Sequence, residues 1–210
     1  DGVLWFFARG VRYQITVAEI CEIYGFDPSN TAMGVPEFPM IGDFWRIIGT
    51  GHWSTAVTQT DIRHPTLRYF IRALASTLLC KMEPNKVRID ELTLLFTAID
   101  GVVDLQDLDP DRDMPMPNLG SLFAQHLVSL KMKPFKGTGR KKETIGSLLT
   151  PIFQHLGIRL TGEPSRTSRA YLDLAHLSSA QWLKDGLLWS FRRGDRLRLL
   201  QLPSRHITDF

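Results

Sequence analysis

The strongest constraint on the fold is a helical period of apolar residues that begins just after Pro65. Apolar side chains recur there at positions i, i+3, i+4 and i+7, and they are Leu67, Phe70, Ile71, Leu74 and Leu78. This spacing is typical of a helix with one buried face, and proline is favoured at a first helical position. The sequence therefore predicts an amphipathic helix that starts at Pro65 and ends at Glu83-Pro84-Asn85.

Three further segments have helical character. A short helix is expected over residues 43–48. Residues 90–99 predict a helix with Asp90 as its N-cap, and its inward positions are Leu92, Leu95, Phe96 and Ile99. Asn118 can cap another helix over residues 118–131, because a short polar side chain satisfies the first free N–H groups of a helix.

The last third of the chain predicts two less regular helices. Residues 144–157 are helical in pattern, but Pro151 lies among them and is expected to kink or break the helix. Residues 170–184 suggest one more helix, capped from Asp173 or Ser168.

Two β-hairpins are expected, one near each end of the chain. Residues 3–15 place aromatic and β-branched side chains on both sides of a turn at Arg9-Gly10. Residues 187–193 and 196–202 flank Gly194-Asp195, a pair suited to a two-residue hairpin turn. 

A first helix is expected directly after the first hairpin. Thr16 and Glu19 have the spacing of a capping box, and the helix over residues 17–24 ends at Gly25. Its predicted inward residues are Ile20, Ile23 and Tyr24.

Together these elements predict a mainly α (α+β) fold, a single helical domain over residues 1–210 with a small hairpin near each end. An acidic linker (101–117) and a basic linker (131–142) are expected within it. The 210 residues suffice for one real core. No apolar run approaches the roughly 20 residues of a membrane span, and no signal-peptide pattern occurs. An intracellular location, cytoplasmic or nuclear, is therefore expected, without contact with a membrane.

Motifs for nucleotide or calcium binding fail at specific positions. The loops Gly49-Thr50-Gly51 and Gly137-Thr138-Gly139 lack the features of a P-loop or a dinucleotide-binding motif. The acidic run that begins at Asp107 has Arg112 and Asn118 where a calcium loop requires Gly and Glu. These segments are better interpreted as packing turns and a solvated acidic linker.

Metal and catalytic residues are not grouped in the sequence either. The six histidines form no i, i+4 pair. Cys21 and Cys80 lie in apolar helical patterns, so they are expected to be buried reduced thiols and not zinc ligands or a disulfide. No catalytic, cofactor-binding or metal site is expected, no cofactor is implied, and the chain is not expected to be an enzyme.

Charge is distributed unevenly along the chain. Residues 1–130 hold 10 Lys and Arg against 16 Asp and Glu, a net charge of −6, whereas residues 131–210 hold 15 against 6, a net charge of +9. Such asymmetry indicates an anionic partner for the basic part. The alternative is that the two parts complement each other in the folded chain.

The basic linker is the main candidate for nucleic-acid binding. Flexible cations with an aromatic residue, here Phe135, suit single-stranded RNA or another nucleic acid, and the alternative interpretation is a solvated loop. Strand alternation in the last hairpin puts two further arginines on one face and the leucines on the other. The candidate nucleic-acid-binding residues are Lys131, Lys133, Lys136, Arg140, Lys141, Lys142, Arg196 and Arg198.

Several blocks resemble one family, the first-open-reading-frame proteins of Athila-type plant retrotransposons, which are gypsy-class long-terminal-repeat elements. The blocks FWRIIGTG, IRHPTLRYFIRALASTLL and EPNKVRIDELTLLF resemble the central part of that family, and IGSLLTPIFQHLGI a later part. The segments YLDLAHLSSAQWL and WSFRRGDRLRLLQLPSRHIT resemble the closing part of that family. The opening segment FFARGVRYQITVAEICEIYGF also resembles, more weakly, the start of plant mobile-domain proteins.

This resemblance implies a non-enzymatic retrotransposon-derived protein, Gag-like and structural or associated with nucleic acid. A zinc knuckle, a protease triplet and a polymerase signature are not seen in the sequence. The alternative is a protein–protein interaction module domesticated from a mobile element, with self-association as one form of partner. The segment from Asp43 to Trp53 is expected to be a packing corner, with Phe44, Trp45 and Ile48 buried against the helix of residues 65–80.

Overall fold

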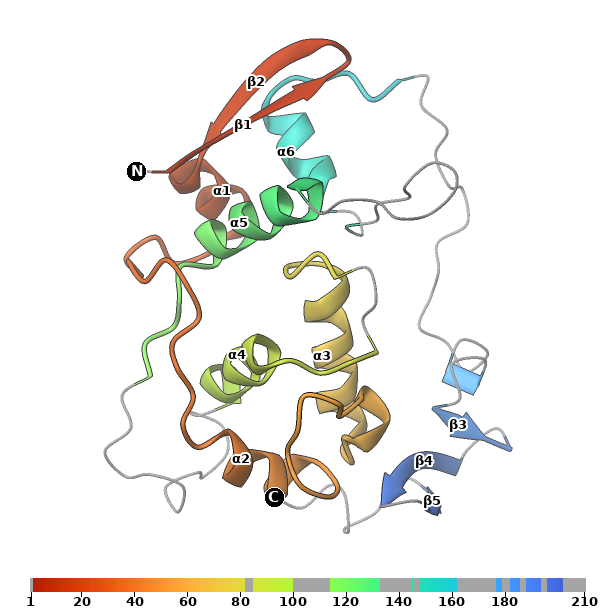
Figure 1. The fold of residues 1–210 in the computed structure, drawn as a ribbon. Helices are drawn as coiled ribbons and strands as arrows, with labels where there is room; N and C mark the ends of the chain where they lie inside the picture. The colour runs from red at the N-terminus through yellow and green to blue at the C-terminus, as the bar shows by residue number, and fades with distance from the viewer. Residues whose placement is uncertain are drawn as a thin grey trace. The chain divides into compact units, whose positions relative to one another are not determined.

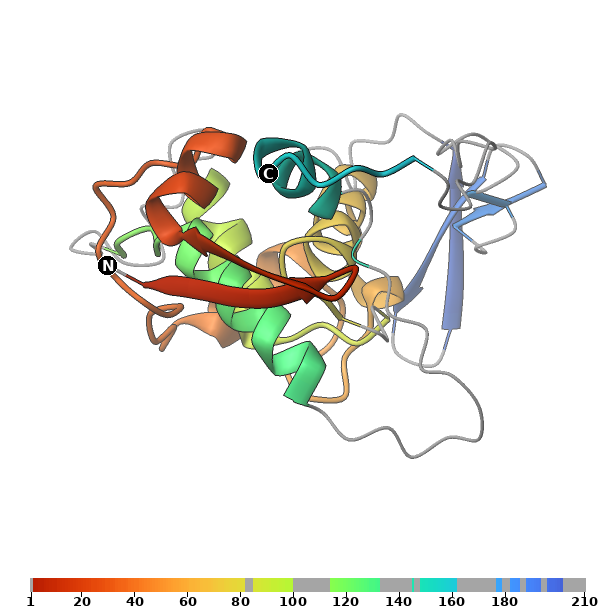
Figure 2. The same ribbon diagram turned by 90° about the horizontal axis from the view of Figure 1, so that it is seen from above.

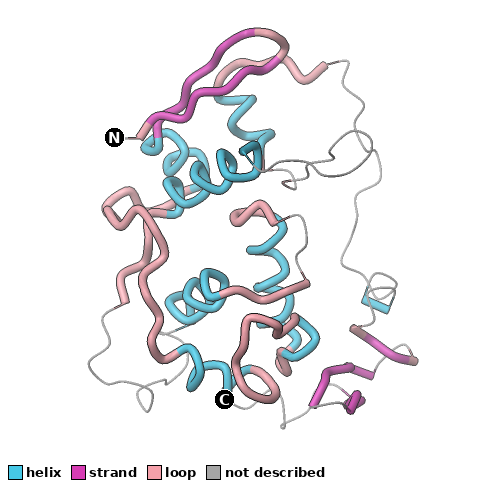
Figure 3. Tube along the Cα trace, in the orientation of Figure 1, coloured by secondary structure: helices cyan, strands magenta, loops and turns pink. Residues whose placement is uncertain are grey.

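The structure is a computed structural model that describes residues 2–81, 85–99, 114–132, 145, 148–161, 177–178, 182–185, 188–193 and 196–201 (Figure 1). Strands and helices both occur, so the expected α+β class is confirmed. In chain order the elements are β1 Val3–Ala8, β2 Val11–Thr16, α1 Val17–Tyr24, α2 Ile41–Ile48, η1 Gln59–Asp61, α3 Pro65–Ser76, α4 Ile89–Ile99, α5 Leu119–Met132, α6 Leu149–His155, β3 Leu183–Lys184, β4 Leu188–Arg193 and β5 Arg196–Gln201. Figure 3 shows the expected strand pairs, one near each end of the chain.

The chain divides into two compact units. Unit 1 contains Asp1–Glu37, Ala73–Pro84 and Asp113–Glu163, and unit 2 contains Phe38–Arg72, Asn85–Arg112 and Pro164–Phe210. Each unit is therefore assembled from segments that are distant in sequence. The single domain over residues 1–210 stays a prediction, as do the two linkers within it. Residues 100–113 and 133–144, which hold most of both linkers, lie outside the described residues.

Unit 1 begins with the antiparallel hairpin of β1 and β2 (Figure 2). Its register runs from Val3 opposite Thr16 to Ala8 opposite Val11. Arg9 and Gly10 both have positive φ, 52° and 78°, which is the backbone that a two-residue hairpin turn with right-handed strand twist requires. The expected hairpin is thus confirmed.

Helix α1 starts and ends as the sequence predicts. The N–H of Glu19 donates to Thr16 Oγ1 at 3.1 Å, and the N–H of Thr16 donates to Glu19 Oε2 at 2.7 Å. This reciprocal pair is a capping box, and Gly25 ends the helix with a φ of 68°. Ile20 and Cys21 are fully buried, whereas Ile23 and Tyr24 are only half-buried.

Helices α5 and α6 pack against α1 in unit 1 (Figure 1). The ring of Tyr24 meets Phe123 of α5 edge to face at 5.8 Å between centroids. Asn118 caps α5 as expected, because its Oδ1 accepts the N–H of Ser121 at 2.8 Å. Gly120 allows the close approach of α5 to α1, since a Cβ at that position would lie 2.6 Å from Cys21 Sγ.

Unit 2 contains α2, α4 and most of α3. Three phenylalanine rings form part of its core, with centroid distances of 5.7 Å for Phe38–Phe44, 4.8 Å for Phe38–Phe96 and 5.2 Å for Phe44–Phe96. Phe96 belongs to α4, and α2 packs on α4. Phe44 is thus buried as predicted, but its aromatic partner on a helix is in α4 and not in α3.

Two helix starts differ from the prediction. Helix α4 begins at Ile89, so Asp90 lies within its first turn, and the carboxylate of Glu91 accepts the N–H of Arg88 at 2.6 Å instead. Helix α6 begins at Leu149 and continues through Pro151. Pro151 does not break it, because the N–H groups of a first helical turn have no partner within the helix.

Two helix ends also differ. Helix α3 ends at Ser76, and Thr77–Leu79 form turns. In the segment predicted as a helix over residues 170–184, Leu177 and Ser178 are helical, but Leu183 and Lys184 form strand β3. This strand pairs with β4, which explains the difference: the ladder satisfies backbone groups that a helix would otherwise satisfy. Residues 170–176 and 179–181 lie outside the described residues.

Candidate nucleic-acid interface

The structure describes three of the eight predicted cations. Lys131 lies in the last turn of α5 in unit 1, and Arg196 and Arg198 lie on β5 in unit 2. The other five lie outside the described residues: Lys133, Lys136, Arg140, Lys141 and Lys142. Arg196 and Arg198 therefore lie on the same strand, whereas Lys131 belongs to the other unit.

Strand β5 presents its arginines only partly as expected. Because side chains alternate along a strand, Arg196 and Arg198 share a face, and Leu197 and Leu199 lie on the other face. Leu200, however, has the same parity as the arginines, so the leucines do not all lie opposite them. Both arginines are exposed, while Leu200 is half-buried against the cluster of Trp182, Leu183, Trp189 and Phe191.

Strand β4 attaches the hairpin of β4 and β5 to the rest of unit 2. The indole N–H of Trp189 donates to the carbonyl oxygen of Arg63 at 2.7 Å. The N–H of Ser190 donates to the carbonyl oxygen of Trp182 at 3.0 Å. Trp189, Ser190 and Phe191 are all buried, so the strand beside β5 is held on both of its faces.

Arg68 contacts the hairpin of β4 and β5. It is unusual because it is a charged residue with no exposed surface. Its Nη1 donates to Ser190 O at 2.9 Å, and its Nη2 donates to Ile62 O at 2.6 Å and Thr60 O at 3.1 Å. The guanidinium also lies 4.0 Å from the ring centroid of Trp189. Arg68 therefore joins α3, the loop before it and β4.

Burial lowers the pKa of Arg68 to about 9, and the nearby carboxylate of Asp61 acts in the opposite direction. The guanidinium is still charged at neutral pH. Three backbone carbonyl groups and an indole face replace its hydration, which is the arrangement that makes a buried cation tolerable.

Arg63 binds the carboxyl end of α2. Its Nη2 donates to the carbonyl oxygens of Arg46, at 3.1 Å, and of Ile47. The last carbonyl groups of a helix have no partner within the helix and carry partial negative charge, so a cation there stabilises α2. The backbone of Arg63 contributes as well, since its N–H donates to Ile48 O at 2.9 Å.

The glycine loop after α2 is a packing corner, as predicted. Trp45 and Ile48 are buried, and a Cβ on Gly49 would lie 2.4 Å from the indole of Trp45, so only glycine fits there. Gly51 has a φ of 72°, and the N–H of Thr50 donates to Asp61 O at 2.9 Å. Arg46 and His52 are exposed, and Arg46 pairs with Asp43.

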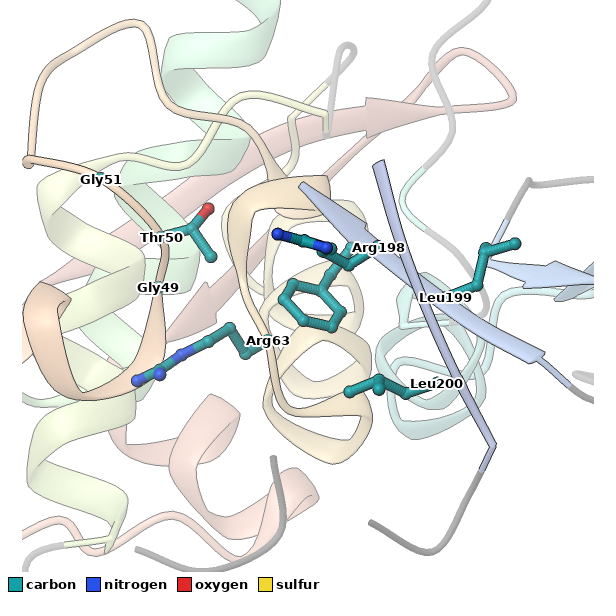
Figure 4. A pocket seen from close by; sticks show the side chains of 8 residues that line it. Gly49, Thr50, Gly51, Arg63, Arg198, Leu199 and Leu200 are labelled. Carbon is teal, nitrogen blue, oxygen red and sulfur yellow. The ribbon is translucent and has the colours of Figure 1, made fainter. Parts of the chain in front are cut away.

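The same loop also lines a cavity, which the sequence does not predict. The cavity has a volume of about 630 Å³. Its walls combine the glycine loop with β4 and β5, and its lining residues are Gly49, Thr50, Gly51, Arg63, Phe191, Arg198, Leu199 and Leu200. Figure 4 shows the side chain of Arg198 reaching towards Thr50, whereas the guanidinium of Arg63 points away from Arg198.

This arrangement is chemically suited to an anion with an apolar portion. Arg198 supplies a guanidinium at the cavity, and the second cation, Arg63, adds positive charge at its wall. Phe191 and Leu200 provide apolar surface beside these charges. The Thr50 hydroxyl donates to the carbonyl oxygen of Asp61 at 3.3 Å, so it already stabilises the loop.

Sequence reasoning missed Arg63 and Arg68. Arg68 carries a signal that can be found, because it stands three and seven residues before Ile71 and Ala75 on the buried face of α3. A charge inside an apolar helical stripe indicates either a paired buried group or a functional one. Arg63 has no such signal, since its partners are carbonyl groups of another helix.

Within the described part of the chain, no group of three or more His, Cys, Asp or Glu side chains is placed to hold a metal ion. Both cysteines are buried and are not joined in a disulfide, as expected. Among the same described residues, no helix combines the length and apolar character that crossing a membrane requires.

Comparison with known proteins identifies the family. The model of the ATHILA ORF-1 family matches residues 1–209, which is nearly the whole chain. No curated protein and no solved structure matches the chain. The match confirms the resemblance carried by the sequence blocks from FWRIIGTG onwards. The chain therefore belongs to the ATHILA ORF-1 family and derives from a retrotransposon.

Proposed function

We propose that this chain is a non-enzymatic, Gag-like structural protein of its element that associates with single-stranded nucleic acid. The single observation that carries the proposal is the cavity beside β5, where the exposed Arg198 lies beside an apolar wall. Arginine on an exposed strand contacts phosphate oxygens, and a concave apolar wall accommodates a base or a sugar. The volume of about 630 Å³ falls within the usual range of binding pockets.

Two polar side chains of the cavity form hydrogen bonds within the fold itself. Arg63 donates to the carboxyl end of α2, and Thr50 donates to Asp61 O. These groups build the loop and hold the helix, and Arg198 is the exposed one that reaches the cavity. Binding, with no bond-making step, is what this arrangement supports.

The test is the binding of a fluorescent 12-residue oligouridylate across a salt series, compared between the wild-type chain and the Arg196→Ala/Arg198→Ala variant. For single strands each phosphate-contacting cation contributes about 0.7 to the slope of log affinity against log salt. The double variant is therefore expected to lower the slope by about 1.4. Arg159→Ala is the matched control, because Arg159 is exposed in unit 1.

A loss of about 0.7 in slope for Arg159→Ala, the same loss per cation, would mean that any exposed cation serves, which contradicts a defined site on β5. An unchanged slope and affinity in the Arg196→Ala/Arg198→Ala variant would refute the β5 site directly. Both variants alter exposed side chains, so their folding is expected to stay within about 0.5 kcal/mol of the wild type.

A second candidate function is a protein-interaction module domesticated from a mobile element. The observation that favours it lies in unit 1, where large apolar side chains of β1 and α5 are exposed together. Their exposed fractions are 52% for Trp5, 73% for Phe7 and 78% for Met132. Such a group of apolar side chains on one surface is typical of an interaction site, whereas single exposed apolar residues are ordinary.

A further inference from the structure

An apolar groove runs through unit 1 between β1 and the helices α5 and α6. It has a volume of about 400 Å³. Strand residues Leu4 and Phe6, helix residues Leu130 and Ile152, and the rim residues Phe7 and Met132 are among those that line it. Lys131 is the one charged side chain in its lining among the described residues.

The walls of the groove are held in place before anything binds. Phe6 stacks on Tyr13 of β2 at 5.9 Å between ring centroids and lies 6.1 Å from Phe153 of α6. Arg9 in the hairpin turn donates to the carbonyl oxygen of Thr161 at 3.0 Å, which ties the far end of the hairpin to the segment after α6. A preformed groove lowers the entropic cost of binding.

The described segments that form the groove carry charges of one sign. The segments that form it, residues 2–16, 119–132 and 149–155, contain no Asp or Glu. They contain three cations, Arg9, Arg12 and Lys131. Arg12 lies over the ring of Trp5, 4.2 Å from its centroid, so one of these charges stands directly beside the exposed aromatic residues.

From the apolar lining and the one-sided charge, we infer that this groove binds an acidic amphipathic peptide segment of a partner protein. Apolar anchors of the segment fill the groove, and its carboxylates face Arg12 and Lys131. Recognition of an amphipathic segment by an apolar groove is a recurring mode of protein interaction, and aromatic, Met and Arg residues are enriched where such partners bind. The inference rests on the second candidate function and is independent of nucleic-acid binding.

Two other occupants fit the observations less well. Single-stranded nucleic acid needs a row of cations that follows its phosphates, but Lys131 is the one charged side chain among the described residues that line this groove. The groove segments of a second copy carry the same cations and no Asp or Glu, so they lack the opposite charge that an acidic segment provides. An acidic segment has neither difficulty.

The experiment is a selection from a display library of random 16-residue peptides on the full chain, with counter-selection on the Phe7→Ala/Met132→Ala variant. We expect enriched peptides that carry apolar residues at helical spacing and a net negative charge. The best peptide, synthesised and labelled, is expected to bind the double variant about 10-fold or more weakly than the wild type in fluorescence anisotropy, the size expected for loss of buried anchors.

Matched variants separate the parts of the inference. Tyr69→Ala removes an exposed aromatic residue that does not line the groove, and it is expected to leave peptide affinity unchanged. Arg12→Gln/Lys131→Gln is expected to weaken binding several-fold at low salt and to lose that effect at high salt. Phe7 and Met132 are mostly exposed, so their removal leaves the fold intact, which circular dichroism checks.

Four results would overturn the inference. The first is that no peptide is enriched over the counter-selection variant. The second is that enriched peptides are neutral or basic yet still depend on Phe7 and Met132, which would keep the interaction function and discard the acidic partner. The third is that a 12-residue oligouridylate competes with the peptide for the groove. The fourth is that the chain dimerises by light scattering and the Phe7→Ala/Met132→Ala variant does not.

Discussion

At the scale of single residues, Arg68 decides how the last hairpin is attached. It binds carbonyl groups of Thr60 and Ile62 near the start of α3 and of Ser190 on β4, which is 122 residues away in the chain. The planar guanidinium can donate in several fixed directions at once, and it stacks on Trp189. Lysine has neither property.

Replacement of Arg68 is expected to destabilise the protein strongly. Arg68→Ala leaves buried carbonyl groups without donors, so we expect a loss of about 3 kcal/mol in the free energy of unfolding. Arg68→Lys keeps the charge but not the fork, and it is expected to recover less than half of that loss. Urea unfolding followed by tryptophan fluorescence measures both.

Arg159→Ala is the control for this experiment, and as an exposed residue it is expected to change stability by less than about 0.5 kcal/mol. If Arg68→Lys were as stable as the wild type, a simple buried charge would suffice, and the proposed need for the several donors of a planar guanidinium would be wrong.

The residue patterns predicted which side chains are buried more accurately than they predicted which elements cover them. The apolar positions of the corner, Phe44, Trp45 and Ile48, are buried as expected from their type and spacing. Helix α2 packs on α4, and the ring of Phe44 meets Phe96 of α4, whereas the sequence predicts packing against the helix of residues 65–80. Periodicity tells which face of a helix is buried but not which element covers it.

At the scale of elements, helix α1 is fully defined by local interactions. Thr16, Glu19 and Gly25 provide its start and its end within ten residues, so the sequence predicts both correctly. The hydrogen bonds from Thr16, first its backbone N–H and then its hydroxyl, lower the pKa of Glu19, and His155 of α6 contributes further. The charged form of Glu19 is therefore favoured in the folded chain.

The capping box is expected to make stability depend on pH. Because the pKa of Glu19 is lowered on folding, its contribution is present above its ordinary pKa and is lost as pH falls through the lowered value. Glu19→Gln is expected to be less stable than the wild type at neutral pH, with a gap that closes on acidification. Thr16→Ala is expected to lose about 1 kcal/mol at pH 7.

The measurement is urea unfolding across a pH series below neutrality, with Glu22→Gln, an exposed carboxylate on the same helix, as the matched control. A gap to the wild type that narrows equally for Glu22→Gln and Glu19→Gln would show that general charge, and not the capping box, is responsible.

At the scale of the whole molecule, charge is the property on which the proposed association with nucleic acid depends. The sequence gives residues 131–210 a net charge of +9 within a protein of net charge +3. Exposed cations act on a polyanion through the release of counterions, so their effect depends on their number and on salt more than on exact geometry.

Neutralising the basic linker is expected to reduce the salt dependence of binding to single-stranded RNA. Six Gln substitutions, at Lys131, Lys133, Lys136, Arg140, Lys141 and Lys142, are expected to lower the slope of log affinity against log salt by about 4, at about 0.7 for each cation. Fluorescence anisotropy with the 12-residue oligouridylate measures the slope. A slope equal to that of the wild type would confine any binding to β5 and contradict a role for the linker.

By itself, the sequence determined the elements whose causes are local. Both hairpins, the start of α5 at Asn118 and the capping box of α1 depend on residues a few positions apart, whose conformational preferences act in any surroundings. Only the tertiary structure decided that Arg68 is buried beneath β4, that Leu183 and Lys184 form a strand, and that the Gly49 loop lines a cavity with Arg198. These features join segments more than a hundred residues apart, or need a partner strand, so no local pattern can determine them.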